Sequence, residues 1–171
     1  DNNVLLAYLN EGRIEDVRAH LEQMNTRLES IVTAPYCKNI AVNSVLQANA
    51  ALAAQKGVDF RCQANVPEAL SLREFELAAV VSNLAENAVL AAAKLEAPAD
   101  RYVQVRLYPV KQQLLISVSN PYAGTLDFSE ESGLPRSHRG AEHGYGLRSV
   151  QFFAEQTGAA FDCTAEDGLF S

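Results

Sequence analysis

The sequence predicts an α+β fold, in which helices cover one face of a mixed, partly antiparallel sheet. Long segments with apolar residues at helical spacing alternate with short, β-branched runs that are typical of strands. Two such runs, Tyr102–Tyr108 and Gln113–Ser119, are separated by a short polar turn and predict a β-hairpin. A chain of 171 residues can hold one domain with a substantial core and a short helical appendage.

The first part of the chain, residues 1–34, predicts a helical hairpin. Residues 4–9 are apolar, Gly12 interrupts, and an apolar stripe at helical spacing then runs from Ile14 to Ile31. A lone hairpin has little surface to bury itself against, so we expect the stripe to complete a bundle across a homodimer. Residues 32–36 break the pattern and predict a linker, which places the second domain at residues 35–171.

The second part of the chain predicts the remaining helices and strands. In chain order they are a helix over Asn39–Gln55, a strand over Val58–Gln63, a helix over Ser71–Leu95, the hairpin, a helix over Leu147–Thr157 and a strand over Ala160–Thr164. Ser71, with Glu74 three residues later, is the expected N-cap of the longest helix. Residues 121–145 show no period and are rich in Gly, Ser, Pro and charge, and a loop of that length is usually either a functional lid or disordered.

Composition narrows the possible functions. The hydrophobic share of 48% and the charged share of 20% are those of a globular protein. The net charge of -7, with scattered Lys and Arg, excludes a general nucleic-acid surface. The three cysteines have no C-x-x-C spacing, which argues against a disulfide framework or a zinc site and favours the cytoplasm.

Two amides stand out on the longest predicted helix. Asn83 and Asn87 are four residues apart, so they lie one above the other beside the apolar stripe, and Lys94 follows on roughly the same face. Asn is a poor helix former, but its amide oxygen can ligate Mg²⁺ together with nucleotide phosphates. The alternative is that both are solvated surface residues.

Two further elements follow in an order that suits a nucleotide site. Asn120 comes directly after a predicted strand, where polar groups often project into a cleft. The run His143-Gly144-Tyr145-Gly146-Leu147 then opens a helix. Its glycines would let backbone N–H groups approach an anion at the helix N-terminus.

These elements together resemble the GHKL superfamily of Bergerat-fold ATP-binding domains over roughly Asn39 to the C-terminus. Asn83 to Ala88 is similar to the N box, N-x-x-x-N-A, which implies that Asn87 ligates Mg²⁺. Ser119-Asn120 stands where the first glycine box begins, and the common Asp that contacts adenine is here Asn120. Residues 143–147 resemble the second glycine box, and Gly133 to Arg139 the ATP lid. The resemblance is strongest to the histidine kinases that sense extracellular peptides.

The resemblance also implies a role for each candidate residue. Gyrase-type hydrolases of this superfamily have a Glu at the first N-box position, whereas histidine kinases have Asn, as here at Asn83. We expect Glu86 to support the site rather than to act as a base. The implied cofactors are ATP and Mg²⁺, and the implied nucleotide-binding residues are Asn83, Asn87, Lys94, Asn120, Ser137, His143, Gly144, Tyr145, Gly146 and Leu147, with Arg136 and Arg139 as further candidate phosphate contacts.

The implied function is an ATP-dependent protein-histidine kinase of a two-component system. It would be the cytoplasmic part of a membrane sensor, a homodimer through its N-terminal helices and the partner of a response regulator. We expect the phosphoacceptor His before Asp1, because His20 lies on the second predicted helix and no acid follows it directly. One alternative is a catalytically degenerate GHKL-like scaffold or a phosphotransfer or docking protein. Another is an anti-sigma-type serine kinase, which the predicted hairpin argues against.

Overall fold

The computed structural model divides the chain into two units, Asp1–Ala34 and Pro35–Ser171. The residues that it describes are 11–18, 34–68, 73–111, 113–129, 133–135 and 145–171. In the first unit, residues 14–18 are helical. The rest of the predicted hairpin, His20 included, lies outside the described residues.

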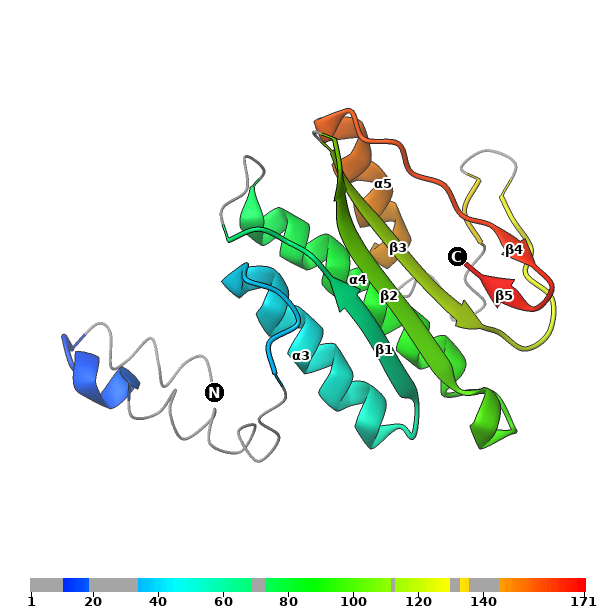
Figure 1. Cartoon of the computed structure of the whole chain (residues 1–171), viewed down its shortest axis with the longest axis horizontal. Coiled ribbons are helices and arrows are strands. Elements are labelled where there is room, and N and C mark those ends of the chain that lie inside the picture. The colour runs from blue at the N-terminus through cyan, green and yellow to red at the C-terminus, as the bar shows by residue number, and fades with distance from the viewer. Residues whose placement is uncertain (1–10, 19–33, 69–72, 112, 130–132, 136–144) are drawn as a thin grey trace. The chain divides into compact units, whose positions relative to one another are not determined.

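The second unit is a five-stranded mixed sheet (Figure 1). Its strands are β1 (Asp59–Ala64), β2 (Tyr102–Val110), β3 (Gln113–Pro121), β4 (Ala165–Glu166) and β5 (Leu169–Phe170). The order across the sheet is β1-β2-β3-β5-β4, in which β1 and β2 are parallel and every other neighbouring pair is antiparallel. This arrangement confirms the α+β prediction.

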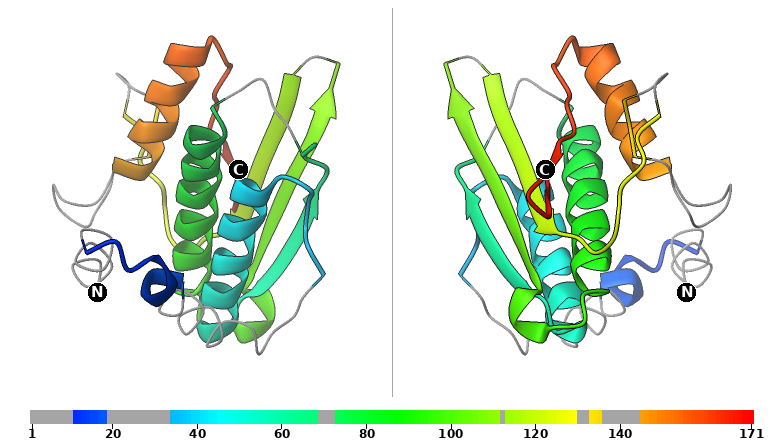
Figure 2. Two further views of the ribbon diagram at one scale, coloured as in Figure 1. Left: turned by 90° about the vertical axis from the view of Figure 1, so that its left-hand side faces the viewer. Right: turned by 90° about the vertical axis from the view of Figure 1, so that its right-hand side faces the viewer.

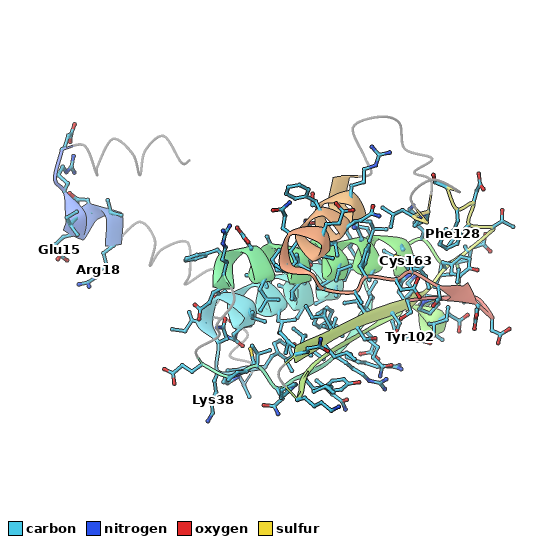
Figure 3. The ribbon with its side chains drawn as sticks, turned by 90° about the horizontal axis from the view of Figure 1, so that it is seen from above. Glu15, Arg18, Lys38, Tyr102, Phe128 and Cys163 are labelled. Atoms are coloured by element: carbon cyan, nitrogen blue, oxygen red, sulfur yellow. The ribbon has the colours of Figure 1, made fainter. Side chains whose placement is uncertain are left out.

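Three helices form the second layer (Figures 2 and 3). They are α3 (Ile40–Gln55), α4 (Glu74–Ala92) and α5 (Tyr145–Thr157), and a short 3-10 turn, η1 (Pro98–Asp100), precedes β2. All three lie on one face of the sheet. The layers meet because β2 alternates: Val103, Val105 and Leu107 have no exposed surface and belong to the core shared with α3 and α4.

Helix α4 is the central element of this core. Its length and apolar composition would also suit a membrane span, but Leu77, Val81 and Val89 are buried within the fold, as in the core helix of a globular domain. The helix is shorter than predicted at both ends. Its N-cap position is Arg73, so the predicted cap at Ser71, which lies outside the described residues, is wrong. Glu74 instead accepts a hydrogen bond from Asn39 Nδ2.

The predicted strand over Ala160–Thr164 is also wrong. Those residues are not in a strand, and backbone pairing begins only at the last of them, Thr164, which exchanges two hydrogen bonds with Ser171 just before β4. Phe161 and Cys163 alternate with polar residues, but a strand needs a hydrogen-bonding partner. The tight Asp167-Gly168 turn supplies one for residues 164–166. Both φ angles of this turn are positive, at 49° and 77°, as a two-residue hairpin loop requires.

The long loop after β3 and the helix that follows it begin differently from the prediction. Strand β3 extends beyond Ser119 because Asn120 and Pro121 pair with Phe170 and Leu169 of β5. Part of the following loop is regular: Phe128 and Pro135 form a β-bridge, and Leu134 is buried. Helix α5 begins at Tyr145, two residues before the predicted start.

Candidate functional site

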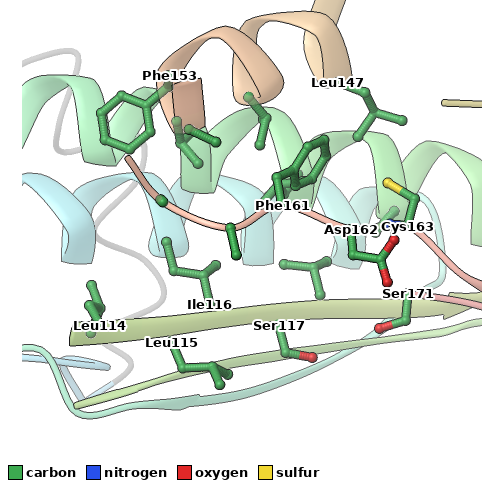
Figure 4. Close-up of a pocket in the computed structure, with 18 of the residues that line it drawn as sticks. Leu114, Leu115, Ile116, Ser117, Leu147, Phe153, Phe161, Asp162, Cys163 and Ser171 are labelled. Carbon is green, nitrogen blue, oxygen red and sulfur yellow. Dashed lines mark hydrogen bonds between the residues drawn. The ribbon is translucent and has the colours of Figure 1, made fainter. Parts of the chain in front are cut away.

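A cavity of about 960 Å³ lies between β3 on one side and α4 and α5 on the other. Figure 4 shows Leu114 and Ile116 on the side of β3 that faces the helices, with Leu147 and Phe153 reaching in from α5. Residues 159–163 cross the space between the layers. The described lining includes Leu77, Val80, Leu84, Asn87, Ala88, Ala91, Leu114, Ile116, Val118, Asn120, Tyr122, Leu126, Pro135, Leu147, Val150, Phe153, Phe161, Asp162 and Cys163.

Asn87 is the polar N-box residue that lines this cavity. Its side chain is exposed, while the next residue, Ala88, is only 4% exposed and packs into the core. The helix therefore anchors its backbone and leaves the amide group open to the cavity. Asn83, one turn earlier, is half-buried, and Glu86 is exposed. Neither of these two is among the described lining residues.

Asn120 supplies a polar group from the opposite side of the cavity. It is only 2% exposed, and its Nδ2 donates a 2.9 Å hydrogen bond to the Pro121 carbonyl oxygen. Within the described part of the chain, this is the one hydrogen bond of the Asn120 side chain. The Nδ2 bond fixes the orientation of the amide, so its oxygen is left as an acceptor at the cavity wall.

The first turn of α5 lies against Asn87. A Cβ atom placed on Gly146 would be 2.6 Å from Asn87 Nδ2, so only glycine fits there without a shift. Tyr145, Gly146 and Leu147 open the helix, and their backbone N–H groups are free of helical partners, as an anion site needs. Leu147 also lines the cavity.

Several predicted site residues lie elsewhere. Lys94 follows the end of α4, is exposed and is not among the described lining residues. Ser137, His143 and Gly144 lie outside the described residues, as do Arg136 and Arg139. The structure thus brings together Asn87, Asn120 and the start of α5 from three distant parts of the sequence.

Sequence reasoning missed the apolar part of the site. Ile116 and Val118 line it from β3. They are two residues apart on that strand, and this spacing could have indicated that both face the same layer of helices. Phe161 lines it from the segment predicted as a strand. Because residues 160–163 are not in a strand, pattern alone could not place Phe161.

The titratable groups that line the cavity do not form a nucleophilic centre. Burial, together with the negative charge of Asp162, raises the pKa of the Cys163 thiol, so it stays neutral at pH 7. Asp162 itself accepts a 3.0 Å hydrogen bond from the Cys163 N–H. Among the described residues, no three His, Cys, Asp or Glu side chains gather as a metal site. A cation here would be held by amide and phosphate oxygens, which suits Mg²⁺.

Comparisons with known proteins agree with this geometry. The family model of the GHKL domain matches residues 72–171, which include α4, Asn120 and α5. A comparison with curated proteins gives no match. The match extends over more than half of the sequence and is consistent with the mixed five-stranded sheet and its layer of helices. The chain therefore belongs to the GHKL family of ATP-binding domains.

Proposed function

We propose that this GHKL domain is the catalytic module of a sensor histidine kinase, which binds Mg²⁺-ATP and transfers the γ-phosphoryl group to a protein histidine. The observation that carries the proposal is Asn83 at the first N-box position, where gyrase-type relatives have a Glu. An amide cannot take a proton from water, so the hydrolysis of ATP by water would be slow.

The cavity supports nucleotide binding. Its volume of about 960 Å³ lies at the upper end of the usual range for ligand sites, which is large enough for a nucleoside triphosphate. Asn120 offers one fixed acceptor at 2% exposure, which suits the exocyclic amino group of adenine. The N–H groups that open α5 suit phosphate oxygens.

The residues present also suit Mg²⁺. Asn87 is exposed to the cavity, and no described residue hydrogen-bonds to its amide, so its oxygen is available as a ligand. When bound, Mg²⁺ would neutralise phosphate charge. Asn87 and the start of α5 would hold the phosphates, Asn120 would orient the base and the apolar lining would exclude water.

The carboxylates near the site favour transfer over hydrolysis. Asp162 is the one carboxylate among the described lining residues, and it is exposed and bonded to its neighbour's N–H. Glu86 is exposed and is not among the described lining residues. We assign Glu86 a supporting role. The proposal further includes a homodimer formed by the helices of residues 1–34, a response regulator as the next phosphate acceptor and a place on the cytoplasmic side of a membrane.

Asn83→Glu tests the choice between kinase and hydrolase. With γ-labelled ATP and Mg²⁺, the parent chain should release little free phosphate, and Asn83→Glu should release at least about tenfold more. Asn83→Gln is the matched control and should behave as the parent does. With a chain that carries the acceptor histidine, the parent should produce an acid-labile, alkali-stable phosphoprotein. Rapid phosphate release by the parent, with no labelled acceptor, would make the chain a hydrolase.

A further inference from the structure

Gly146 differs from the other described glycines in what surrounds it. A Cβ atom on Gly146 would lie 2.6 Å from Asn87 Nδ2, 3.5 Å from Asn87 Cγ and 3.6 Å from Asn87 Oδ1. At each of the other described glycines, such an atom would meet nothing within 4 Å. Those glycines also have positive φ, so their role is conformational, whereas the role of Gly146 is to leave space.

All three nearest atoms belong to the end of one side chain. A methyl group on Gly146 would therefore meet the Asn87 amide before any backbone atom. Helix α5 is held against the rest of the fold by Val150 and Ala154, which are 4% and 6% exposed. Since the packed face of α5 resists movement and an exposed amide does not, Asn87 would be displaced.

We propose that Gly146 is a positioning residue for Asn87, and that the first turn of α5 sets the direction in which the Asn87 amide oxygen meets the metal. The nitrogen of the amide is the atom that faces Gly146, and the oxygen is 1 Å farther from the Cβ position, at 3.6 Å against 2.6 Å. The contact therefore turns the ligand oxygen away from α5. This inference rests on the proposed binding of Mg²⁺-nucleotide.

The contact also joins the two halves of the phosphate site. The α5 N-terminus offers N–H groups to phosphates, and Asn87 offers an oxygen to the metal that the same phosphates ligate. A displaced Asn87 would weaken the metal-dependent part of nucleotide binding and leave the metal-free part in place. Substitution of a residue that matters only for folding would weaken nucleotide binding equally with and without the metal.

Gly146→Ala tests this separation. A fluorescent ATP analogue is titrated into the parent and variant chains in Mg²⁺ and in EDTA. We expect Mg²⁺ to tighten nucleotide binding to the parent at least about tenfold, and to tighten binding to Gly146→Ala less than about threefold. In EDTA the two proteins should bind the nucleotide with the same affinity, and their Tm values should be equal. Gly57→Ala is the control: nothing lies near Gly57, its φ is +65°, and its substitution should lower Tm without changing the effect of Mg²⁺.

A double-mutant cycle completes the test. Asn87→Ala removes all three atoms that the methyl group would meet, so adding Gly146→Ala to it should change nothing further. Three results for Gly146→Ala would overturn the proposal. Mg²⁺ could tighten nucleotide binding as much as it does in the parent, the affinity could fall as much in EDTA as in Mg²⁺, or the variant could unfold. If the parent binds the nucleotide in neither Mg²⁺ nor EDTA, the proposed function fails and this inference falls with it.

Discussion

Asn39 Nδ2 lies 3.2 Å from Glu74 Oε1 and donates a hydrogen bond to it, so the first turn of α3 is tied to the first residue of α4. The same side chain is fully buried and makes two more hydrogen bonds. Its Oδ1 caps α3 by accepting from the Val42 N–H at 3.0 Å, and its Nδ2 also donates to the Glu68 carbonyl oxygen at 3.1 Å. One amide therefore joins the starts of two parallel helices and the loop between β1 and α4.

Asn39→Ala should destabilise the domain strongly. The substitution removes a helix cap, leaves the buried Val42 N–H without its side-chain partner, and breaks the hydrogen bonds that hold α3 to the Glu68 carbonyl and to Glu74. We expect a loss of about 2–3 kcal/mol in the free energy of unfolding, measured by urea titration. Ser44→Ala is the matched control in the same helix: the Ser44 hydroxyl is exposed and bonds only to the Ile40 carbonyl, so its loss should change stability by less than about 0.5 kcal/mol.

The junction at Asn39 shows where sequence patterns reach their limit. The periods of α3, β1, β2 and β3 predict these elements to within about two residues, because each buries one regular face. The start of α4 does not follow from a period. A Ser-x-x-Glu pattern predicts a cap at Ser71, but Glu74 is engaged by Asn39, a residue 35 positions earlier in the chain. The partner of Glu74 is therefore set by a tertiary hydrogen bond, which a short stretch of sequence cannot reveal.

Cys62 should make the domain less stable in alkaline solution. Burial, reinforced by the nearby Cys37, raises the pKa of the Cys62 thiol from 9.0 to about 12. Between these values the unfolded thiol has lost its proton and the folded thiol has kept it. The unfolded state then binds fewer protons, so the contribution of Cys62 is complete below pH 9 and declines as the pH rises toward 12.

Urea unfolding at about pH 8 and about pH 10.5 measures this effect. The unfolding midpoint of the parent should fall further between the two pH values than that of Cys62→Ala. Lys and Tyr groups titrate in both proteins, so only the difference between them reports on the thiol. Equal declines would mean that the Cys62 thiol is as acidic in the folded state as in the unfolded state.

Only part of the candidate site could be predicted from the sequence, because sequence patterns report on single helices and strands and not on how they pack. Asn87 and Asn120 were identified because an amide in the middle of an apolar helix or at the end of a strand needs an explanation. Asn83 and Lys94 share a helix with Asn87, but sequence spacing gives an angle about the helix axis and not a distance to the cavity. The contact of Gly146 with Asn87 depends on how α5 packs on α4, which no local pattern encodes.

Asn120 should decide which purine the cavity accepts. Because its Nδ2 is held at 2.9 Å by the Pro121 carbonyl, its Oδ1 is presented as an acceptor, and an acceptor favours the 6-amino group of ATP over the 6-oxo group of ITP. We expect calorimetry with Mg²⁺ to show that the parent prefers ATP at least about tenfold, and that Asn120→Ala binds both nucleotides with similar, weaker affinity. Asn120→Asp keeps an acceptor at the same place and should retain the preference for ATP. If ITP binds to the parent as well as ATP does, another group must contact the base, and the fixed amide is only a structural feature of the end of β3.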